Sequence, residues 1–536
     1  MIETFVSRSG AKSLRIDGTA FHSSYDPRKE ARAFIEANLS GEDPAVVLLL
    51  GEGLGYASAA LKERLPHARI LSVFHSAPLH ALAGDSGDAC WHPGCGIDLP
   101  SFLRRHLTEL DVEGLKVLEW PVSARVFPEE SLRTGSQVRE TVRELAGNVV
   151  TTAGFGRRWL RNSLINWIRL ETVLSGSPCR KDRPVLVAAS GPTLARSLPA
   201  IRDVRDRIDL WALPSAVEVL AHNGLRPDLV VMTDAGHWSA VHLHHAVRGL
   251  TVAMPLSAAT GTWAPAARTF LLQQPTFFER GILSAAGLRP PQIPPQGTVT
   301  ATALLLALRS TEREVILAGL DLCILDLESH ARPNAFDTLL RRDDYRLSPH
   351  SDRCFRRAMD QAPRGRRLPE GMVRFPPPLR AYADWFSRLG PVASRIHRMY
   401  PSAVALPSLH AMDDAGLRRL AMQRPATDAG PDFHDDPDYP STERRVRIAS
   451  DLIGQWSRSL HELRDLAVRD ADSIQFDGPT AEISYFLDPR GVLELRRTLR
   501  RSGSSGASRI AASCLSGGID FLDSLQERYL GHAVPA

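Results

Sequence analysis

Two segments of this chain contain a similar local pattern, in which a short apolar run leads through a glycine-containing turn into a helix-forming stretch. The first pattern starts at Val46 to Leu50, passes through Gly51-Glu52-Gly53-Leu54-Gly55 and reaches a second apolar run at 70–74. The second starts at 184–190, PVLVAAS, and alternates apolar runs with helical stretches as far as AGLDL, which ends at residue 322. Strand, crossover helix and strand in this order form right-handed units of a parallel sheet. The chain is therefore predicted to be an α/β protein.

The spacing of these patterns predicts several domains. We expect a smaller, degenerate Rossmann-like α/β domain at 1–150 and a bridging segment at 151–180, whose amphipathic helix occupies 157–174. A central, doubly wound Rossmann-type domain is expected at 181–422, with residues 326–380 irregular. An Asp/Pro-rich linker at 431–440 precedes a helical domain at 441–536, where Ser441 or Thr442 can cap a long helix and two more helices are expected at 491–501 and 507–530.

Composition excludes several classes of protein. With 536 residues, 43% hydrophobic and 24% charged, the chain is not disordered, collagen-like or disulfide-stapled. Its net charge of +4 does not indicate nucleic-acid binding. The six cysteines form no Cys-x-x-Cys pair, and the nearest two are Cys90 and Cys95, so reduced thiols are expected rather than a zinc site. Without a secretory h-region or a membrane-length apolar run, the protein is expected in the cytoplasm, not at a membrane.

The glycine turn at 51–55 has two interpretations. Glycines at this place let a backbone approach a phosphate or an adenosine. However, Phe74-His75-Ser76 stands where a ribose-binding acidic residue is expected. The alternative is a purely structural turn in a degenerate domain.

The turn Ser190-Gly191-Pro192-Thr193 also has two interpretations. Gly191 permits close approach, Pro192 suits the start of a helix, and the two hydroxyls can add donors, so the turn can cradle an anion. The alternative is a tight strand-to-helix turn that needs glycine and proline for its geometry alone.

The central domain contains three further clusters of polar residues. Asp326, Glu328 and His330 alternate and can hold a metal in an extended loop, and the cluster His237, His242, His244 and His245 can pair on a helix, but solvated loops and helix faces are the commoner outcome. We therefore predict no metal. Residues 341–380 carry eleven arginines against five acidic residues, which fits a phosphate or carboxylate clamp on a mobile lid or acceptor surface, or a solvated loop.

The order of several motifs resembles one known family. VLVAASGPTLARSLPAI, HNGLRPDLVVMTDAG, GTVTATALLLAL and VILAGLDL followed by SHARPN are similar to the motility-associated factor (Maf) flagellin glycosyltransferases, whose central domain is shared with 6-hydroxymethylpterin diphosphokinase MptE-like proteins. TTAGFGRRWLRNSLIN resembles their bridge helix, and LRAYADWFSRLG with LPSL resembles their central-domain ending.

This resemblance implies a sialyltransferase-like central fold and a reaction. Maf proteins transfer a nonulosonic acid, of the pseudaminic, legionaminic or sialic type, from a CMP donor to Ser or Thr of flagellin before export. Flagellin and the CMP-sugar are the implied partners, with a flagellar export chaperone as a further one, and no cofactor is expected.

The resemblance implies that residues near the ends of strands in this chain bind the nucleotide and carry out catalysis. The donor-binding residues would be Ser190, Gly191, Pro192, Thr193, Ser215, Gly297 and Thr298, and the catalytic residues Asp234, Asp321 and His330. Histidine suits the base that takes the acceptor's proton, since its ordinary pKa is about 6.5. This chain departs from the family at Pro214, where many relatives are acidic, and at Asp234-Ala235, where Asp-Pro is usual.

Two other functions compete with glycosyl transfer. A pterin pyrophosphokinase would need ATP and Mg²⁺, hence clustered carboxylates, and no acidic residue lies two positions after Asp234. A flagellin-binding factor that has lost its chemistry would fit Pro214.

Overall fold

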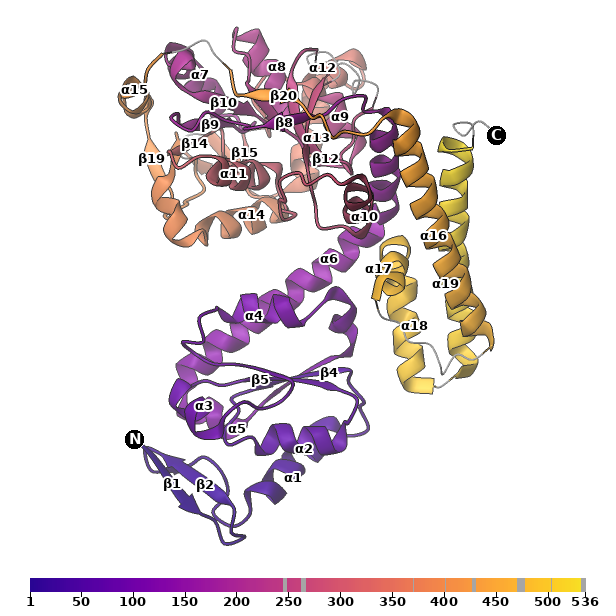
Figure 1. Cartoon of the computed structure of the whole chain (residues 1–536). Coiled ribbons are helices and arrows are strands. Elements are labelled where there is room, and N and C mark those ends of the chain that lie inside the picture. Colours follow the sequence, from indigo (N-terminus) through magenta and orange to yellow (C-terminus); the bar gives the residue numbers. More distant parts are fainter. Residues whose placement is uncertain are drawn as a thin grey trace. The chain divides into compact units, whose positions relative to one another are not determined.

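The structure is a computed structural model that describes residues 1–243, 248–261, 267–369, 371–400, 402–426, 430–469, 478–502 and 504–531. The chain divides into two compact units, residues 1–156 with 458–520 and residues 157–457 with 521–536. The C-terminal part of the chain is divided between these units, with residues 458–520 in the first and residues 521–536 in the second. The α/β class predicted from the sequence is confirmed in both (Figure 1).

The first unit opens with a β-rich segment and continues with a four-stranded parallel sheet of order β6-β5-β4-β7. Leu49 and Ile70 pack with helix α1 on one side of the sheet, while Leu48 and Leu71 pack with α4 and α6 on the other. Its elements are β1 (Ile2–Val6), β2 (Lys12–Ile16), β3 (Thr19–Ala20), α1 (Pro27–Leu39), β4 (Val46–Leu50), α2 (Tyr56–Arg64), β5 (Arg69–Val73), α3 (Ala77–Ala83), β6 (Ala89–Trp91), α4 (Leu99–His106), β7 (Leu115–Glu119) and α5 (Pro121–Val126).

The bridging helix is longer than the sequence indicated. Helix α6 spans Pro128–Arg169, and strand β8 (Leu174–Gly176) already occupies the end of the range predicted as helix. Helix propensity is low around Gly147 and Gly154, yet the helix continues because Leu145 and Leu160 are buried by packing.

The second unit contains the doubly wound sheet. Its ten described strands have the order β19-β18-β14-β9-β10-β11-β12-β13-β8-β20, and only β20 runs antiparallel to its neighbour. Helices α7 and α8 lie on one face of this sheet and α11 and α14 on the other (Figure 1). Residues of α11 and α14 join the strand residues in one buried apolar cluster.

The elements of the second unit follow one another as strand and helix. They are β9 (Val185–Ala188), α7 (Leu194–Asp203), β10 (Asp209–Ala212), α8 (Pro214–His222), β11 (Leu229–Val231), α9 (His237–Val241), β12 (Thr251–Pro255), β13 (Arg268–Leu272), α10 (Phe277–Ala286), α11 (Val299–Ser310), β14 (Val315–Ala318), β18 (Ile396–Met399), β19 (His410–Met412), α15 (Asp414–Met422) and β20 (Phe433–Asp435). Strand β20 lies inside the segment predicted as a linker.

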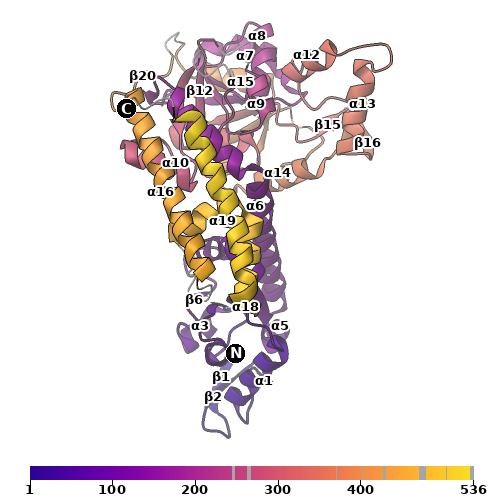
Figure 2. The ribbon, with the colours of Figure 1, turned by 90° about the vertical axis from the view of Figure 1, so that its right-hand side faces the viewer.

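The expectation that residues 326–380 are irregular is wrong. This segment forms α12 (Ala335–Arg342), α13 (His350–Gln361), β16 (Gly365–Leu368), β17 (Gly371–Arg374) and the start of α14 (Pro377–Ser387), and β17 lies between β16 and β15 (Ile324–Leu325). The Asn334 side chain caps α12 by accepting the Asp337 amide at 3.1 Å. Figure 2 shows α12, α13 and β16 together beside the large sheet.

The described residues after β20 form four helices: α16 (Thr442–Arg469), α17 (Gly478–Leu487), α18 (Pro489–Ser502) and α19 (Ser504–Tyr529). Ser441 caps α16 as predicted, since its hydroxyl accepts the Arg444 amide. Helix α17 was not predicted. Within the second unit, Ser457 on α16 donates to Asp523 on α19 at 3.1 Å.

Candidate functional site

The strand order of the large sheet reverses between β9 and β14. From β9 the chain proceeds outward through β10 to β13, and it then returns to add β14 on the other side of β9. Ala188 and Ala318 pair across these two strands, so both strands end at the same level. In open α/β sheets a crevice for ligands forms at such a switch point, outside the carboxyl ends of the strands.

The turn after β9 and the loop after β14 are joined by hydrogen bonds. The Asp321 carboxylate accepts the Thr193 amide at 2.7 Å and the Thr193 hydroxyl at 2.6 Å. The Gly191 amide donates to the Gly319 carbonyl at 2.9 Å. A Cβ at Gly191 would lie 2.4 Å from an Asp321 oxygen, so only glycine fits there.

These contacts change the interpretation of the predicted anion cradle. The Thr193 amide and hydroxyl, both expected to hold phosphate, are already bonded to Asp321. Of the four residues that the family resemblance assigns to donor binding in this turn, Ser190, Gly191 and Pro192 are partly exposed and Thr193 is buried. The geometric requirement for Gly191 is therefore evident, while nucleotide binding at the turn stays a prediction.

Two groups next to Asp321, the buried Arg398 and the partly buried Ser402, fix the backbone around it. Arg398, only 2% exposed, donates to the Leu320 carbonyl, and the Ser402 hydroxyl donates to the Asp321 carbonyl at 2.6 Å. Burial raises the pKa of Asp321, and the bonds from Thr193 and the charges of Arg398 and Arg196 oppose that rise. Both carboxylate oxygens of Asp321 accept hydrogen bonds from Thr193. Asp321 therefore links the loop after β14 to the turn after β9 in this structure.

A small cavity lies directly beside the hydrogen-bonded pair Asp321 and Thr193. Exposed Arg196 borders it from α7 and is close enough to Asp321 to influence the pKa of that carboxyl. The cavity is lined by Thr193, Arg196, Asp321, Cys323, Leu325, Val373, Ser402 and Ala403.

His330 lies in the loop that crosses the switch point. The Ala331 amide donates to the Ser190 carbonyl at 2.7 Å, which ties this loop to the turn after β9. The Nδ1 atom of His330 is 2.9 Å from the Ser329 hydroxyl. Burial, together with smaller effects of the nearby His242 and Arg357, lowers the pKa of His330 to about 4. The imidazole is therefore neutral at physiological pH and able to accept a proton.

An aromatic and cationic cluster surrounds His330. Its ring centroid lies 6.0 Å from that of Phe336 and 6.1 Å from that of His242. The Arg357 guanidinium, from α13, stands 4.8 Å above the Phe336 ring. Trp238, 57% exposed, also packs edge-on against Phe336. The cluster thus places a cation and an exposed indole beside the candidate base.

Asp234, which follows β11, and Gly297, which precedes α11, both lie near Tyr382. A Cβ at Gly297 would lie 2.7 Å from the Tyr382 ring, and burial together with the Asp234 charge raises the pKa of Tyr382. One Asp234 oxygen accepts the Gly236 amide at 2.7 Å. Thr298 precedes α11 without a side-chain capping bond, so α11 presents its first amides here. Ser215 lies in the first turn of α8 and is partly exposed.

The structure does not bring Asp326, Glu328 and His330 together. Asp326 accepts the Met372 amide at 2.9 Å, and Glu328 lies 3.4 Å from Arg332. In the part of the chain that the structure describes, these three form no group of converging ligand atoms. Of the histidine cluster, His244 and His245 lie outside the described residues.

The N-terminal glycine turn is filled by the protein itself. Buried Glu52 accepts the Gly53 and Ser58 amides, and the Leu54 amide donates to His22. A Cβ at Gly53 would lie 2.3 Å from the His22 ring. This geometry favours the structural-turn alternative.

Four residues near the site were not singled out from the sequence: Trp238, Arg357, Tyr382 and Arg398. Tyr382 stands within the quoted LRAYADWFSRLG motif, and Arg357 is one of eleven arginines in its segment. Only the tertiary packing distinguishes Arg357 from the others.

Comparison with known proteins agrees with this fold. Residues 163–326 match the family model described as 6-hydroxymethylpterin diphosphokinase MptE-like. A solved structure of the Maf glycosyltransferase from Magnetospirillum magneticum AMB-1 matches with a TM-score of 0.52 and 13% identity, over 98% of this chain and 90% of that one. These findings confirm the resemblance indicated by the motifs, and the structural likeness shows a shared fold.

Two uncharacterised proteins of Treponema pallidum (strain Nichols) are also similar. One is 26% identical over 276 residues, which is 50% of this chain and 60% of that protein. The other is 23% identical over 109 residues, or 20% of this chain and 52% of that protein. The chain thus aligns with little more than half the length of these relatives.

Among the described helices, none combines the length and the apolar character that crossing a bilayer requires.

Proposed function

Because residues 163–326 form an MptE-like domain within a chain that has the fold of a Maf glycosyltransferase, we propose that this protein is a glycosyltransferase. It transfers a nonulosonic acid from a CMP donor to Ser or Thr of flagellin before export. The observation that carries the proposal is the neutral His330 in the loop tied to Ser190, at the point where the strand order of the sheet reverses.

The reaction needs two kinds of assistance. Breaking the bond between the sugar and CMP develops negative charge on the phosphate, which oriented amides, hydroxyls and cations stabilise. The first amides of α11, Thr298 and exposed Arg196 have the right chemistry for this. Removal of the acceptor hydroxyl's proton needs a base, and His330 fills that role.

Recognition of the donor would use the cluster around His330. A nonulosonic acid carries a carboxylate, for which an arginine fork is the matching donor. Arg357 is held on Phe336 and lies near enough to His330 to lower its pKa. Exposed Trp238 offers a face on which a sugar or a base can stack.

The remaining assignments extend the same proposal. Flagellin is the acceptor, and a flagellar export chaperone is a further partner. The protein acts in the cytoplasm, without nucleic acid, membrane or cofactor.

A transfer assay tests the function. Purified chain is incubated with flagellin and a CMP-nonulosonate, and intact-mass spectrometry follows the added sugar. Flagellin whose modified Ser and Thr residues are replaced by Ala serves as the control acceptor. Modification of wild-type flagellin alone supports the proposal, whereas absence of transfer with each CMP-nonulosonate contradicts it. Stable flagellin binding without transfer would indicate a non-enzymatic flagellin-binding factor.

A second function, pterin pyrophosphoryl transfer, is favoured by the description of the matched family model. It requires ATP with Mg²⁺, which binds through carboxylates and phosphates. Calorimetric titration with CMP, CDP, ATP and GTP separates the two functions. We expect CMP to bind in preference to ATP, and tight ATP binding without CMP binding would favour the pyrophosphokinase.

A further inference from the structure

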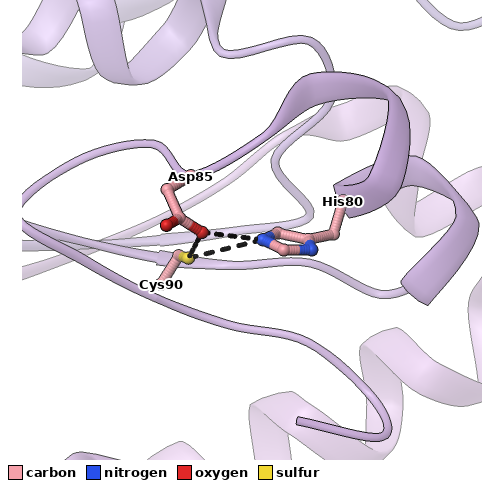
Figure 3. Close-up of side chains that lie close together, drawn as sticks. All are labelled: His80, Asp85 and Cys90. Atoms are coloured by element: carbon pink, nitrogen blue, oxygen red, sulfur yellow. Dashed lines mark hydrogen bonds and ion pairs between the residues drawn. The ribbon is translucent and has the colours of Figure 1, made fainter.

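The first unit contains a convergence of His80, Asp85 and Cys90 that glycosyl transfer does not use. His80 lies on α3, Asp85 in the following loop and Cys90 on β6, the edge strand of the smaller sheet (Figure 3). The three side chains point toward one another across the helix-to-strand turn.

Three atoms of this group approach a single point. The Nε2 atom of His80 lies 2.9 Å from Oδ1 of Asp85, and the Cys90 sulfur lies 3.1 Å from the same oxygen. The sulfur lies 3.7 Å from Nε2 of His80. Ligand atoms around a tetrahedral zinc ion, at bond lengths of about 2.0–2.3 Å, are separated by about 3.3–3.6 Å. Small side-chain adjustments therefore suffice to place an ion between them.

The geometry is not that of a catalytic relay. In a Cys-His-Asp triad the acid and the nucleophile bind opposite ring nitrogens of the histidine. Here Asp85 and Cys90 both approach Nε2 of His80. Burial, with help from Asp85, raises the pKa of Cys90 to about 11, whereas an activated nucleophile has a lowered pKa. Convergence on one nitrogen is the arrangement of metal ligands.

Neighbouring groups hold the histidine ring in place. It stacks on His92 at a centroid distance of 4.0 Å and packs edge-on against Phe74. These two residues directly follow β6 and β5, at the carboxyl edge of the sheet. Gly84 and Gly87 have positive φ angles and allow the tight return of the chain. The His80 ring and the turn that follows α3 are therefore held in position without a bound ion.

The charge of Asp85 is also available for a cation. Its salt-bridge partner among the described residues is His80, and its side chain is 89% exposed, which leaves a path for an ion. A second His-Asp-Cys grouping, formed by His350, Asp337 and Cys354, differs in this respect. Asp337 there also lies 3.4 Å from Arg332 and 3.1 Å from Arg341, so its charge is already compensated.

We propose that His80, Asp85 and Cys90 bind one zinc ion through the imidazole Nε2, a carboxylate oxygen and the thiolate sulfur. Water occupies the fourth position, because Cys95 and His92 lie outside the converging group. The mixed nitrogen, oxygen and sulfur set favours Zn²⁺ over Mg²⁺, which prefers six oxygen ligands. Binding releases the thiol proton to solvent, whereas the imidazole binds in its neutral form with its proton on Nδ1. This site is independent of the proposed glycosyl transfer.

Metal titration of the full chain tests the site. After treatment with a chelator and a non-chelating reductant, the protein is titrated with Zn²⁺ against a fluorescent zinc indicator, and with Co²⁺ by absorbance. We expect one tight site per chain and a thiolate-to-cobalt charge-transfer band. The variants Cys90→Ser, His80→Ala and Asp85→Ala should each lose affinity by about 100-fold or more, since even outer-shell changes cost about 10–100-fold.

Two matched variants serve as controls. Cys95→Ser changes a cysteine in the loop that follows β6, and His350→Ala changes the histidine of the grouping whose aspartate is paired with arginines. Both should bind zinc like the wild type. Circular dichroism checks that every variant is folded, and the conservative Cys90→Ser should also abolish the charge-transfer band. Absence of tight zinc binding by the wild-type chain, or binding unaffected by all three ligand variants, would overturn the proposal.

Discussion

Asp321 accepts two hydrogen bonds from Thr193, one from the amide at 2.7 Å and one from the hydroxyl at 2.6 Å. These residues lie 128 positions apart and close the switch point between β14 and β9. A buried carboxylate thus holds the turn for which the family resemblance implies nucleotide binding.

Replacing Thr193 by valine should destabilise the second unit. The variant keeps the shape of the side chain but removes the hydroxyl donor, which leaves one Asp321 oxygen buried with its partner lost. The expected cost is about 1–3 kcal/mol in the free energy of unfolding. Urea denaturation measures it, with Thr193→Ser, which retains the hydroxyl, as the control. Equal stability of the valine variant and the wild type would show that this bond contributes nothing.

The proposal that His330 is the general base predicts the turnover rate of a His330 variant and the pH profile of the reaction. His330→Ala should lower turnover by about 10²–10⁴-fold. CMP affinity should change little, because the base touches the acceptor. Burial lowers the pKa of His330 to about 4, so its proton-accepting form persists down to that pH. The acid limb of kcat/KM due to this group should therefore lie near pH 4 rather than 6.5.

The measurement is flagellin modification by mass spectrometry, paired with CMP titration. His434→Ala, at an exposed histidine of the same unit, is the control. Modification at the wild-type rate by the His330 variant would remove it from the mechanism. A folded variant that fails to bind CMP would make His330 a donor-binding residue.

Transfer should survive treatment with EDTA. Asp234 has no acidic residue two positions on, and Asp326 and Glu328 are occupied by Met372 and Arg332. Hydroxyls, amides and arginines are therefore expected to stabilise the leaving phosphate. The rate of flagellin modification before and after chelation measures this. Loss of activity restored by Mg²⁺ or Mn²⁺ would instead identify a carboxylate of the central site as a ligand.

Glu279 should make the stability of the second unit depend on pH. It is fully buried on α10, accepts the Ser257 and Gln274 amides at 2.8 Å, and burial raises its pKa from 4.5 to about 7. The folded state therefore holds this proton more tightly than the unfolded state. The resulting stabilisation is fully present below about pH 4.5 and is lost as the pH rises to 7, by up to about 3 kcal/mol.

Urea denaturation at pH 5 and at pH 7.5 checks this behaviour. The variant Glu279→Gln should show a smaller difference between the two values, because the titrating group is gone. Glu312→Gln, at an exposed position, should behave as the wild type. An unchanged difference in Glu279→Gln would assign the pH dependence to other groups.

Zinc should also stabilise the first unit. An ion bound to His80, Asp85 and Cys90 would join α3 to β6, and at 100 times its Kd it should add about 2.7 kcal/mol to the free energy of unfolding. Thermal unfolding with and without Zn²⁺ measures the shift, and Cys90→Ser should abolish it. A shift that persists in this variant would place the ion elsewhere.

The alternating elements of the chain were predictable from residues alone. Residues 46–50 form β4 as expected, and residues within PVLVAAS form β9, because a strand buried on both faces must be apolar throughout. Local rules failed where packing overrode them. The segment 326–380 is rich in arginine and proline, yet it folds into α12, α13 and a small sheet once Cys354 and Ala358 are buried.

The sequence by itself determined the α/β class, the positions of the main strands and the family resemblance, since apolar periodicity and motif order are local properties. Only the tertiary structure decided what the candidate residues do. At the switch point Asp321 accepts the hydrogen bonds of Thr193, and burial keeps the imidazole of His330 neutral. The approach of His80, Asp85 and Cys90 to one another likewise depends on a helix-to-strand turn. The spacing of these residues along the sequence does not show the directions in which their side chains point.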